Sequence, residues 1–397
     1  MHTCSRDLRA EGTRSRGART IATRLRAPRA LATAVGLAAV SVLAMLAGPA
    51  SALAAGHAVF VQTDNLSGNQ IVAYERAGDG TLTQAGTYAT GGLGGQLEGS
   101  VVDHLASQGS LAYDAQNRLL YAVNAGSDTI SVFAVFGDRL ALRQVIASGG
   151  SFPVSIAVDS GLVYVLNGLE GGSLQGFRVI AGRLQAIPGS SRPLGLNPAA
   201  TPQFTNTPGQ VAFSPGGAQL LVTTKENGSN VDVFAVDPLG RLSKTPVVNS
   251  LGGTVPFAMT FDRRGHLLVA EAAGALASFV LGENGTLAQL DSTPTGQTAT
   301  CWLVGARGRF YTSNAGSASL SGFQASAGGQ VLTLFSTTGT SPGPVDAAAT
   351  GNGHFVYLQT GGEGVIDEFA VEAGGVLNEI GSVTVPEAVG GEGIVAP

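Results

Sequence analysis

The segment LAYDAQNRLLYAVNAGSDTISVFAVFGDRL, residues 111–140, contains three short apolar runs separated by turn-forming residues. The runs are rich in Leu, Val, Ile and aromatic residues, and their length and flanking turns are typical of β-strands. A Gly-Asp turn at residues 137–138 then leads into a fourth run at Leu140. The segment therefore predicts four consecutive antiparallel strands joined by tight turns.

The same order of runs and turns recurs along the chain. A Gly-x-(Leu/Val) element opens the fourth run of six copies, at Gly80, Gly182, Gly240, Gly285, Gly329 and Gly375. The looser Gly137-Asp138-Arg139-Leu140 makes a seventh copy. An aromatic residue closes the third run of each copy: Tyr74, Phe133, Phe177, Phe234, Phe279, Phe323 and Phe369. Four strands about every 45 residues indicate the blades of a β-propeller.

The two longest repeats contain loop segments, residues 91–109 and 190–207, which are rich in Gly, Ser, Pro and Asn. The ends of the chain complete the pattern. The first repeat starts at Val59-Phe60-Val61, which has the pattern of a second strand, whereas residues 393–396 have the pattern of an inner strand with no blade after it. We therefore expect an all-β, seven-bladed propeller in which the N- and C-terminal segments pair within one blade.

Composition agrees with an all-β protein. Glycine accounts for 58 of 397 residues, only 12% of residues are charged, and 44% are hydrophobic, which excludes a disordered chain and disfavours a helical one. Residues 1–55 hold eight Arg against two acidic residues, and the remainder carries 14 basic and 25 acidic residues. That acidic balance argues against nucleic acid or an anionic membrane as a partner.

The basic N-terminus leads into an uncharged run, Leu31–Ala47, followed by small-x-small patterns at residues 50–54. This order predicts a signal peptide of about residues 1–55, a secreted or cell-envelope protein, and a single propeller domain at residues 56–397. An uncleaved membrane anchor is the alternative. Without the leader, Cys301 is the one cysteine, so no internal disulfide forms. We expect a monomer with no cofactor and no metal.

Three motifs point to a family: Tyr121-Ala122-Val123-Asn124-Ala125-Gly126, Tyr164-Val165-Leu166-Asn167 and Phe213-Ser214-Pro215-Gly216-Gly217. With the repeats, they resemble the lactonase-type seven-bladed propellers, which include 6-phosphogluconolactonase and the carboxymuconate cyclases. The resemblance covers the whole mature chain. It implies hydrolysis of a lactone, or isomerisation of a cyclic carboxylate, at one mouth of the central channel.

The resemblance also maps catalytic positions onto this chain. Active relatives carry Arg and His before the central Phe-x-Pro motif and an Asn-Glu pair at the end of the next strand. Gly209 and Gln210 stand here at the Arg and His positions, and Glu226, preceded by Lys225, stands at the Glu position. Gln210 is no general base and Gly209 carries no charge. Glu226 is therefore the candidate base, with Glu271 one blade along at the equivalent strand end.

Other polar residues are expected around the same mouth, where inner strands start and second strands end. The candidate ligand-binding residues are Glu271, Asp346, Glu392, Asn124, Asn167 and Asn314. Crowded carboxylates there would raise one another's pKa or bind a cation. Strand alternation predicts that Lys225 points away from the face that carries Glu226. The alternative is that the Asn and Asp side chains only satisfy backbone groups at strand ends.

The remaining candidates are isolated. His266 and His354 follow turns at the far end from the Glu226 mouth, and we expect both at the surface. His104 lies in the loop 91–109, which could fold over the mouth, and Cys301 is expected to be a buried, inert thiol. Two functions stay open: a secreted enzyme that acts on a lactone or related ester, and a non-catalytic propeller that binds a small ligand, a cation or a protein.

Overall fold

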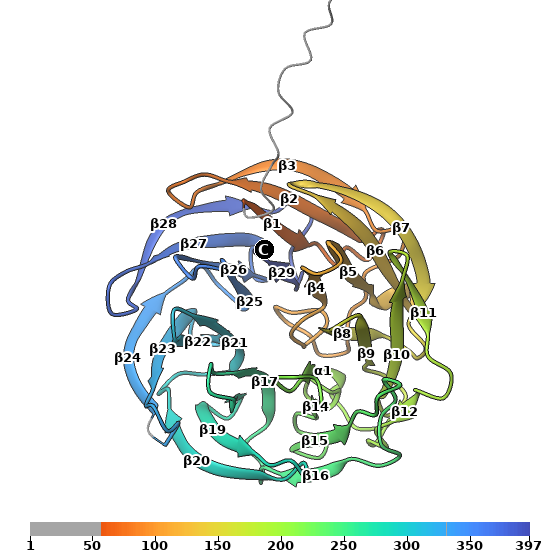
Figure 1. The fold of residues 1–397 in the computed structure, drawn as a ribbon. Coiled ribbons are helices and arrows are strands. Elements are labelled where there is room, and N and C mark those ends of the chain that lie inside the picture. Colours follow the sequence, from red (N-terminus) through yellow and green to blue (C-terminus); the bar gives the residue numbers. More distant parts are fainter. Residues whose placement is uncertain (1–56, 331) are drawn as a thin grey trace, which may run out of the picture. The chain divides into compact units, whose positions relative to one another are not determined.

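The computed structural model describes residues 57–330 and 332–397, which fall in one compact unit, Ala52–Pro397. The predicted signal peptide and its cleavage site lie outside the described residues. Within that range, no helix is long and apolar enough to cross a membrane. The regular structure is almost entirely β-strand, and the strands follow one another around a ring (Figure 1).

In the part of the chain that the structure describes, the strands form seven antiparallel sheets, which we number as blades from the N-terminus. Blade 1 contains β29 (Ile394–Val395), β1 (Ala58–Gln62), β2 (Gln70–Arg76) and β3 (Leu82–Ala89). Blade 2 contains β4 (Leu111–Asp114), β5 (Leu119–Asn124), β6 (Thr129–Phe136) and β7 (Arg139–Ala147). Blade 3 contains β8 (Pro153–Asp159), β9 (Leu162–Asn167), β10 (Ser173–Ile180), β11 (Arg183–Ala186) and the short β12 (Arg192–Pro193).

The other four blades repeat the plan. Blade 4 contains β13 (Gln210–Phe213), β14 (Gln219–Thr223), β15 (Asn230–Ala235) and β16 (Val247–Ser250). Blade 5 contains β17 (Pro256–Phe261), β18 (His266–Glu271), β19 (Ala275–Leu281) and β20 (Leu287–Pro294). Blade 6 contains β21 (Thr300–Ala306), β22 (Arg309–Asn314), β23 (Ser319–Ala325) and β24 (Leu332–Gly339). Blade 7 contains β25 (Pro344–Ala349), β26 (Phe355–Thr360), β27 (Val365–Val371) and β28 (Leu377–Thr384).

Blade 1 closes the ring as the sequence predicts. The C-terminal β29 pairs antiparallel with β1, with Phe60 opposite Val395 and Val61 opposite Ile394. The Gln62 amide also donates a hydrogen bond to Gly393 O at 2.8 Å. Figure 1 shows the C-terminus beside β29 and β1. The two ends of the chain therefore supply different strands of one sheet, which confirms the predicted closure and the seven-bladed fold.

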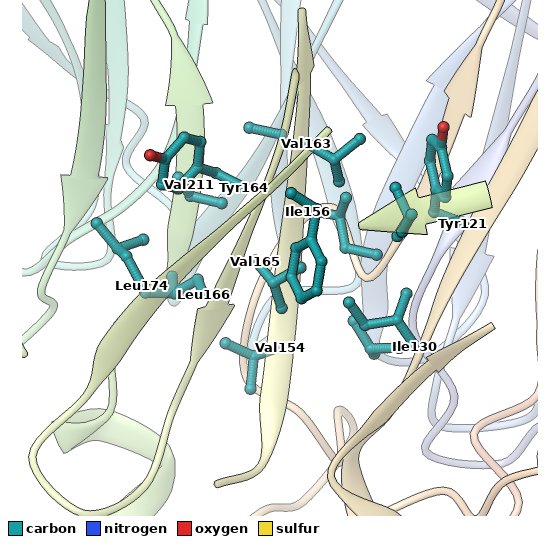
Figure 2. Packing of buried hydrophobic residues seen from close by; sticks show 14 of the residues in the cluster. Tyr121, Ile130, Val154, Ile156, Val163, Tyr164, Val165, Leu166, Leu174 and Val211 are labelled. Carbon is teal, nitrogen blue, oxygen red and sulfur yellow. The ribbon is translucent and has the colours of Figure 1, made fainter. Parts of the chain in front are cut away.

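Burial explains why the strands differ in pattern. The second strand of each blade is packed on both faces by neighbouring blades, so β5 is buried at all six residues and reads as a continuous apolar run. The fourth strand lies at the rim, and β3 is mostly exposed after its first residue. Every predicted third-strand aromatic residue is buried, with at most 2% of its surface exposed. Figure 2 shows side chains of three successive blades, Tyr121, Tyr164 and Val211 among them, in one apolar cluster.

The repeated glycine element has a specific structural reason. In three places within the described residues, a buried tyrosine hydroxyl on one second strand donates to the carbonyl oxygen of a glycine in the next blade. The pairs are Tyr164–Gly240, Tyr311–Gly375 and Tyr357–Gly80, each at 2.6 Å. Gly80 has a φ of +97°, and a Cβ there would lie 2.2 Å from the Phe355 ring. A side chain at this turn would therefore break the contact between blades 7 and 1.

Candidate functional site

The propeller has two distinct ends. Inner strands start and second strands finish at one end, which we call the mouth end, and the turns between first and second strands lie at the other, the turn end. Figure 1 shows β29, β4, β8, β17 and β25 around the centre of the ring. Two long connections reach the mouth end: residues 90–110 between β3 and β4, and residues 187–209 between β11 and β13. We call them the first and second mouth loops.

The first mouth loop enters the channel and bonds to inner strands on several sides. Gly109 O accepts from the Ile156 amide of blade 3 at 2.8 Å, and the Gln108 amide donates to Gly209 O at 3.0 Å. The Gln108 side chain forms a pair of hydrogen bonds with the Leu303 backbone of blade 6, at 2.8 and 2.9 Å. The His104 amide donates to Gly390 O at 2.9 Å. Because inner strands surround the channel, a segment bonded to so many of them fills its mouth.

Lys225 joins the two mouth loops. Its Nζ donates to Ala106 O and Phe204 O, both at 2.6 Å, and to Thr207 Oγ1 at 3.1 Å. The same Nζ lies 5.3 Å from the centre of the Phe257 ring. Burial lowers the pKa of Lys225 to about 7, against the opposing charge of Asp103. One ammonium group thus uses three N–H donors to hold residues from both loops.

Lys225 and Glu226 point to opposite sides, as strand alternation predicts, but the side chain that enters the mouth is that of Lys225. β14 ends at Thr223, two residues earlier, and Lys225 has a φ of +53°, in the left-handed region. Lys225 is buried and Glu226 is exposed.

Three carboxyl groups lie close together in the channel: Asp103 of the first mouth loop, Asp346 of β25, and Glu392 just before β29. Burial raises the pKa of Asp103 to about 6 and that of Asp346 to about 7. Burial, together with the charges of Asp103 and Asp346, raises the pKa of Glu392 well above its usual range. Ser107 Oγ lies 2.6 Å from Glu392 Oε2 and 2.8 Å from Val154 O. Since a hydroxyl has one hydrogen, both contacts are satisfied when Glu392 is protonated and donates to Ser107.

Gly209 and Gln210, which the resemblance matches to Arg and His, have structural roles in this chain. Gln210 Oε1 accepts a hydrogen bond from the Met259 amide at 2.5 Å, which joins blade 4 to blade 5. A Cβ at Gly209 would lie 2.7 Å from Phe257 O and 3.0 Å from Thr223 Oγ1. A side chain as large as Arg therefore does not fit at residue 209 without moving backbone.

The predicted amide residues lie at strand ends and bond to neighbouring strands. Asn124 Nδ2 donates to Ser131 Oγ at 2.8 Å, and Asn314 Nδ2 donates to Ser321 Oγ at 3.0 Å. Asn167 Nδ2 reaches Ser173 O at 3.5 Å. These contacts agree with the alternative that the three side chains satisfy polar groups at strand ends. A role of the three residues in ligand binding stays a prediction.

Glu226 and Glu271 differ in environment. Glu226 is exposed at the mouth end, where its backbone amide donates to Thr205 O of the second mouth loop at 3.1 Å. Glu271 is buried, and that burial raises its pKa. Ser292 Oγ donates to Glu271 Oε2 at 3.5 Å. The catalytic role assigned to Glu226 stays a prediction.

Sequence reasoning missed Asp103 and Ser107 in the channel. The available signal was the length of the first mouth loop, since a loop longer than about 12–15 residues in a compact domain is often functional. His104 in that loop lies with its Nδ1 3.6 Å from Oδ2 of the fully buried Asp64, so a protonated His104 forms an ion pair there. The first mouth loop lies over the mouth through its bonds to Ile156 and Leu303.

A pocket of about 230 Å³ remains beside the filled channel. Its lining residues include Val102, Asp103, Ala106, Phe204, Phe257, Cys301 and Trp302. The rings of Phe257 and Trp302 lie 4.8 Å apart, centre to centre. Burial raises the pKa of the Cys301 thiol to about 12, so the thiol is protonated at neutral pH, as predicted for an inert cysteine. Across the described ranges, no group of three or more His, Cys, Asp or Glu residues is arranged to hold a metal ion.

No protein-family model and no curated protein sequence matches the chain. Solved structures do match. The periplasmic gluconolactonase of Pseudomonas aeruginosa is 18% identical with a TM-score of 0.67, and a protein from Lactobacillus plantarum is 21% identical with a TM-score of 0.68. A candidate 6-phosphogluconolactonase from Bacteroides uniformis is 18% identical with a TM-score of 0.67. Each match covers 85% of this chain and 98% of the other. At these identities the likeness shows a shared fold.

Proposed function

We propose that this chain, which has the fold of the lactonase-type seven-bladed propellers, binds a small ring-containing molecule in the pocket at the mouth end. One observation carries the proposal: the first mouth loop fills the channel and leaves an apolar pocket walled by three aromatic rings. Phe204, Phe257 and Trp302 come from the second mouth loop and from blades 5 and 6. Rings favour stacked or edge-to-face partners, so these walls suit an aromatic or alicyclic ligand.

The size and polarity of the pocket narrow the ligand further. A volume of about 230 Å³ lies below the ~300–1,000 Å³ usual for drug-sized ligands, which favours a molecule of one or two rings. Asp103 is the one acidic residue among the lining residues. Its carboxyl accepts hydrogen bonds from the Leu105 and Ser107 amides at 2.9 and 3.1 Å, and its remaining acceptor positions suit a hydroxyl on the ligand.

Binding without turnover follows from the groups around the pocket. Lys225 uses its N–H donors on the two mouth loops, and the Cys301 thiol is protonated at neutral pH. Gln210 and Gly209 supply neither a base nor a positive charge. The pocket therefore offers recognition by shape and one hydrogen bond.

Lactone hydrolysis is the second candidate. Exposed Glu226 stands at the family's catalytic position on the rim of the mouth end, and one protein of the same fold is named as a periplasmic gluconolactonase. For either function we propose a location outside the cytoplasm, because residues 1–55 have the pattern of a signal peptide.

Fluorescence tests the binding proposal directly, because Trp302 is the one tryptophan of the chain and lines the pocket. Thymol, a single ring with a hydroxyl, should change the Trp302 emission in a saturable way, and its methyl ether should bind at least about fivefold more weakly. Ala315→Leu narrows the pocket and should abolish the signal. Ala373→Leu, in an exposed turn of blade 7, is the matched control.

Two results would overturn this proposal. The first is the absence of a saturable change with both probes, or an equal change in Ala315→Leu and the wild type. The second is turnover of a lactone such as dihydrocoumarin that falls about a hundredfold or more in Glu226→Gln, which would establish the hydrolase instead.

A further inference from the structure

A cluster of four arginines lies at the turn end, away from the mouth. A pocket of about 510 Å³ opens there between blades 5, 6 and 7. Its walls are the first turns of the three blades, at residues 260–264, 305–310 and 350–353, and the end of the third strand of blade 6, at residues 325–327. Three successive blades therefore contribute backbone and side chains to one concave surface.

Four arginines line this pocket: Arg263, Arg264, Arg307 and Arg309. The chain after residue 55 has 14 basic and 25 acidic residues, so more than a quarter of its positive groups meet here in an otherwise acidic molecule. This distribution concentrates positive charge at one site.

The one carboxylate in the wall is already satisfied. Asp262 Oδ2 lies 2.7 Å from His266 Nδ1, and Asp262 Oδ1 accepts the backbone amides of Arg264 and His266 at 2.8 and 2.9 Å. Within the described residues, none of the four arginines lies within 4.0 Å of a carboxylate oxygen. None of these four guanidinium groups is therefore paired in a salt bridge within the described residues.

Two of the guanidinium groups are held in place. Arg309 Nε donates to Gly374 O at 3.1 Å, and its guanidinium lies 5.9 Å from the centre of the Phe335 ring. Arg264 donates to Ala327 O on the opposite wall. Each guanidinium has five N–H donors, so both groups retain donors for a ligand. Arg263 and Arg307 are exposed beside them.

We propose that this pocket binds a small ligand with two or more oxyanion groups, either carboxylates or phosphates. A guanidinium forms paired hydrogen bonds with the planar edge of a carboxylate or with two phosphate oxygens, and several such groups recognise a polyanion better than a monoanion. The site lies at the other end of the propeller from the Trp302 pocket. It therefore stands independently of the proposed ring-binding function.

Isothermal titration calorimetry tests the site with two probes, citrate and pyrophosphate, which distinguish the two anion sources. At low salt the wild type should bind at least one of them and should bind acetate or monophosphate more weakly. Arg263→Ser/Arg307→Ser should weaken binding about tenfold or more, because two charged hydrogen-bonding groups are lost. Arg139→Ser/Arg143→Ser removes the same charge from exposed positions of β7 and is the control.

Preference for citrate would assign a polycarboxylate, and preference for pyrophosphate would assign a phosphate ligand. The proposal would be refuted if neither probe bound at low salt. Equal weakening in the two double variants would also refute it, because the affinity would then follow net charge alone. Circular dichroism should be the same for both double variants, since all four substituted side chains are exposed.

Discussion

Replacing Lys225 by Met should release the two mouth loops from the propeller. The substitution keeps an unbranched apolar side chain of similar length but removes the hydrogen bonds to Ala106 O, Phe204 O and Thr207 Oγ1. A buried acceptor left without its donor costs about 1–3 kcal/mol, and breaking a buried charged contact costs about 3–5 kcal/mol in all. Because burial already disfavours the charged ammonium group, removing that group offsets part of these two costs. We expect a net loss of about 2–4 kcal/mol.

This loss converts into a modest change in melting temperature. A folded domain of about 340 residues has an unfolding entropy of about 0.7 kcal/mol/K near 60 °C, so the expected fall in Tm is about 3–6 °C. If the loops open without global unfolding, the loss of stability is confined to the loops and does not lower the Tm. Elastase, which cleaves after small apolar residues, should then cut the first mouth loop near Val101, Val102 and Ala106.

Calorimetry and limited proteolysis together check the prediction. Lys244→Met is the matched control, because Lys244 is exposed and the change in charge is the same. A Lys225→Met protein with the Tm and the elastase pattern of the Lys244→Met control would refute the role of Lys225 in holding the loops.

Three further predictions concern the channel and the chain ends. The pKa of Glu392 is raised in the folded protein, so its contribution to stability is present below pH 4.5, its ordinary pKa, and is lost as the pH rises through the folded value. Glu392→Gln should therefore make the Tm less dependent on pH and should raise it relative to wild type at alkaline but not at acidic pH; a parallel shift at every pH would contradict this. Deleting Gly390–Pro397 removes β29 and its pairing with β1, together with Glu392 from the channel. The lost hydrogen bonds, at about 0.5–1.5 kcal/mol each, and the lost burial of Ile394 are large against a total stability of about 5–15 kcal/mol. The truncated protein should therefore aggregate or melt at a much lower temperature. A soluble truncated protein with the wild-type Tm would exclude this closure. Export should remove residues up to about 52–55, and N-terminal sequencing of exported protein that began before Leu31 would reject the cleaved signal peptide.

The number of blades, their strand order and the closure of the ring could be predicted from the sequence, because these features depend on short-range patterns. Each buried third-strand aromatic residue and each Gly-x-(Leu/Val) turn repeats at a spacing that reflects one blade, and the incomplete first repeat matches the extra strand at the C-terminus. Such patterns appear in a sequence because neighbouring blades impose the same burial on each copy.

The arrangement at the mouth end depended on tertiary structure. The sequence of the first mouth loop does not recur in the other blades. Its partners, such as Val154 and Glu392, lie far away in the sequence. Alternation does not show which of Lys225 and Glu226 enters the mouth, because β14 stops at Thr223 and the backbone turns through a positive φ at residue 225. Local periodicity in the sequence encodes the repeating scaffold. The contacts by which Lys225 and the first mouth loop fill the channel are absent from that periodicity, because they form only when segments from separate blades meet.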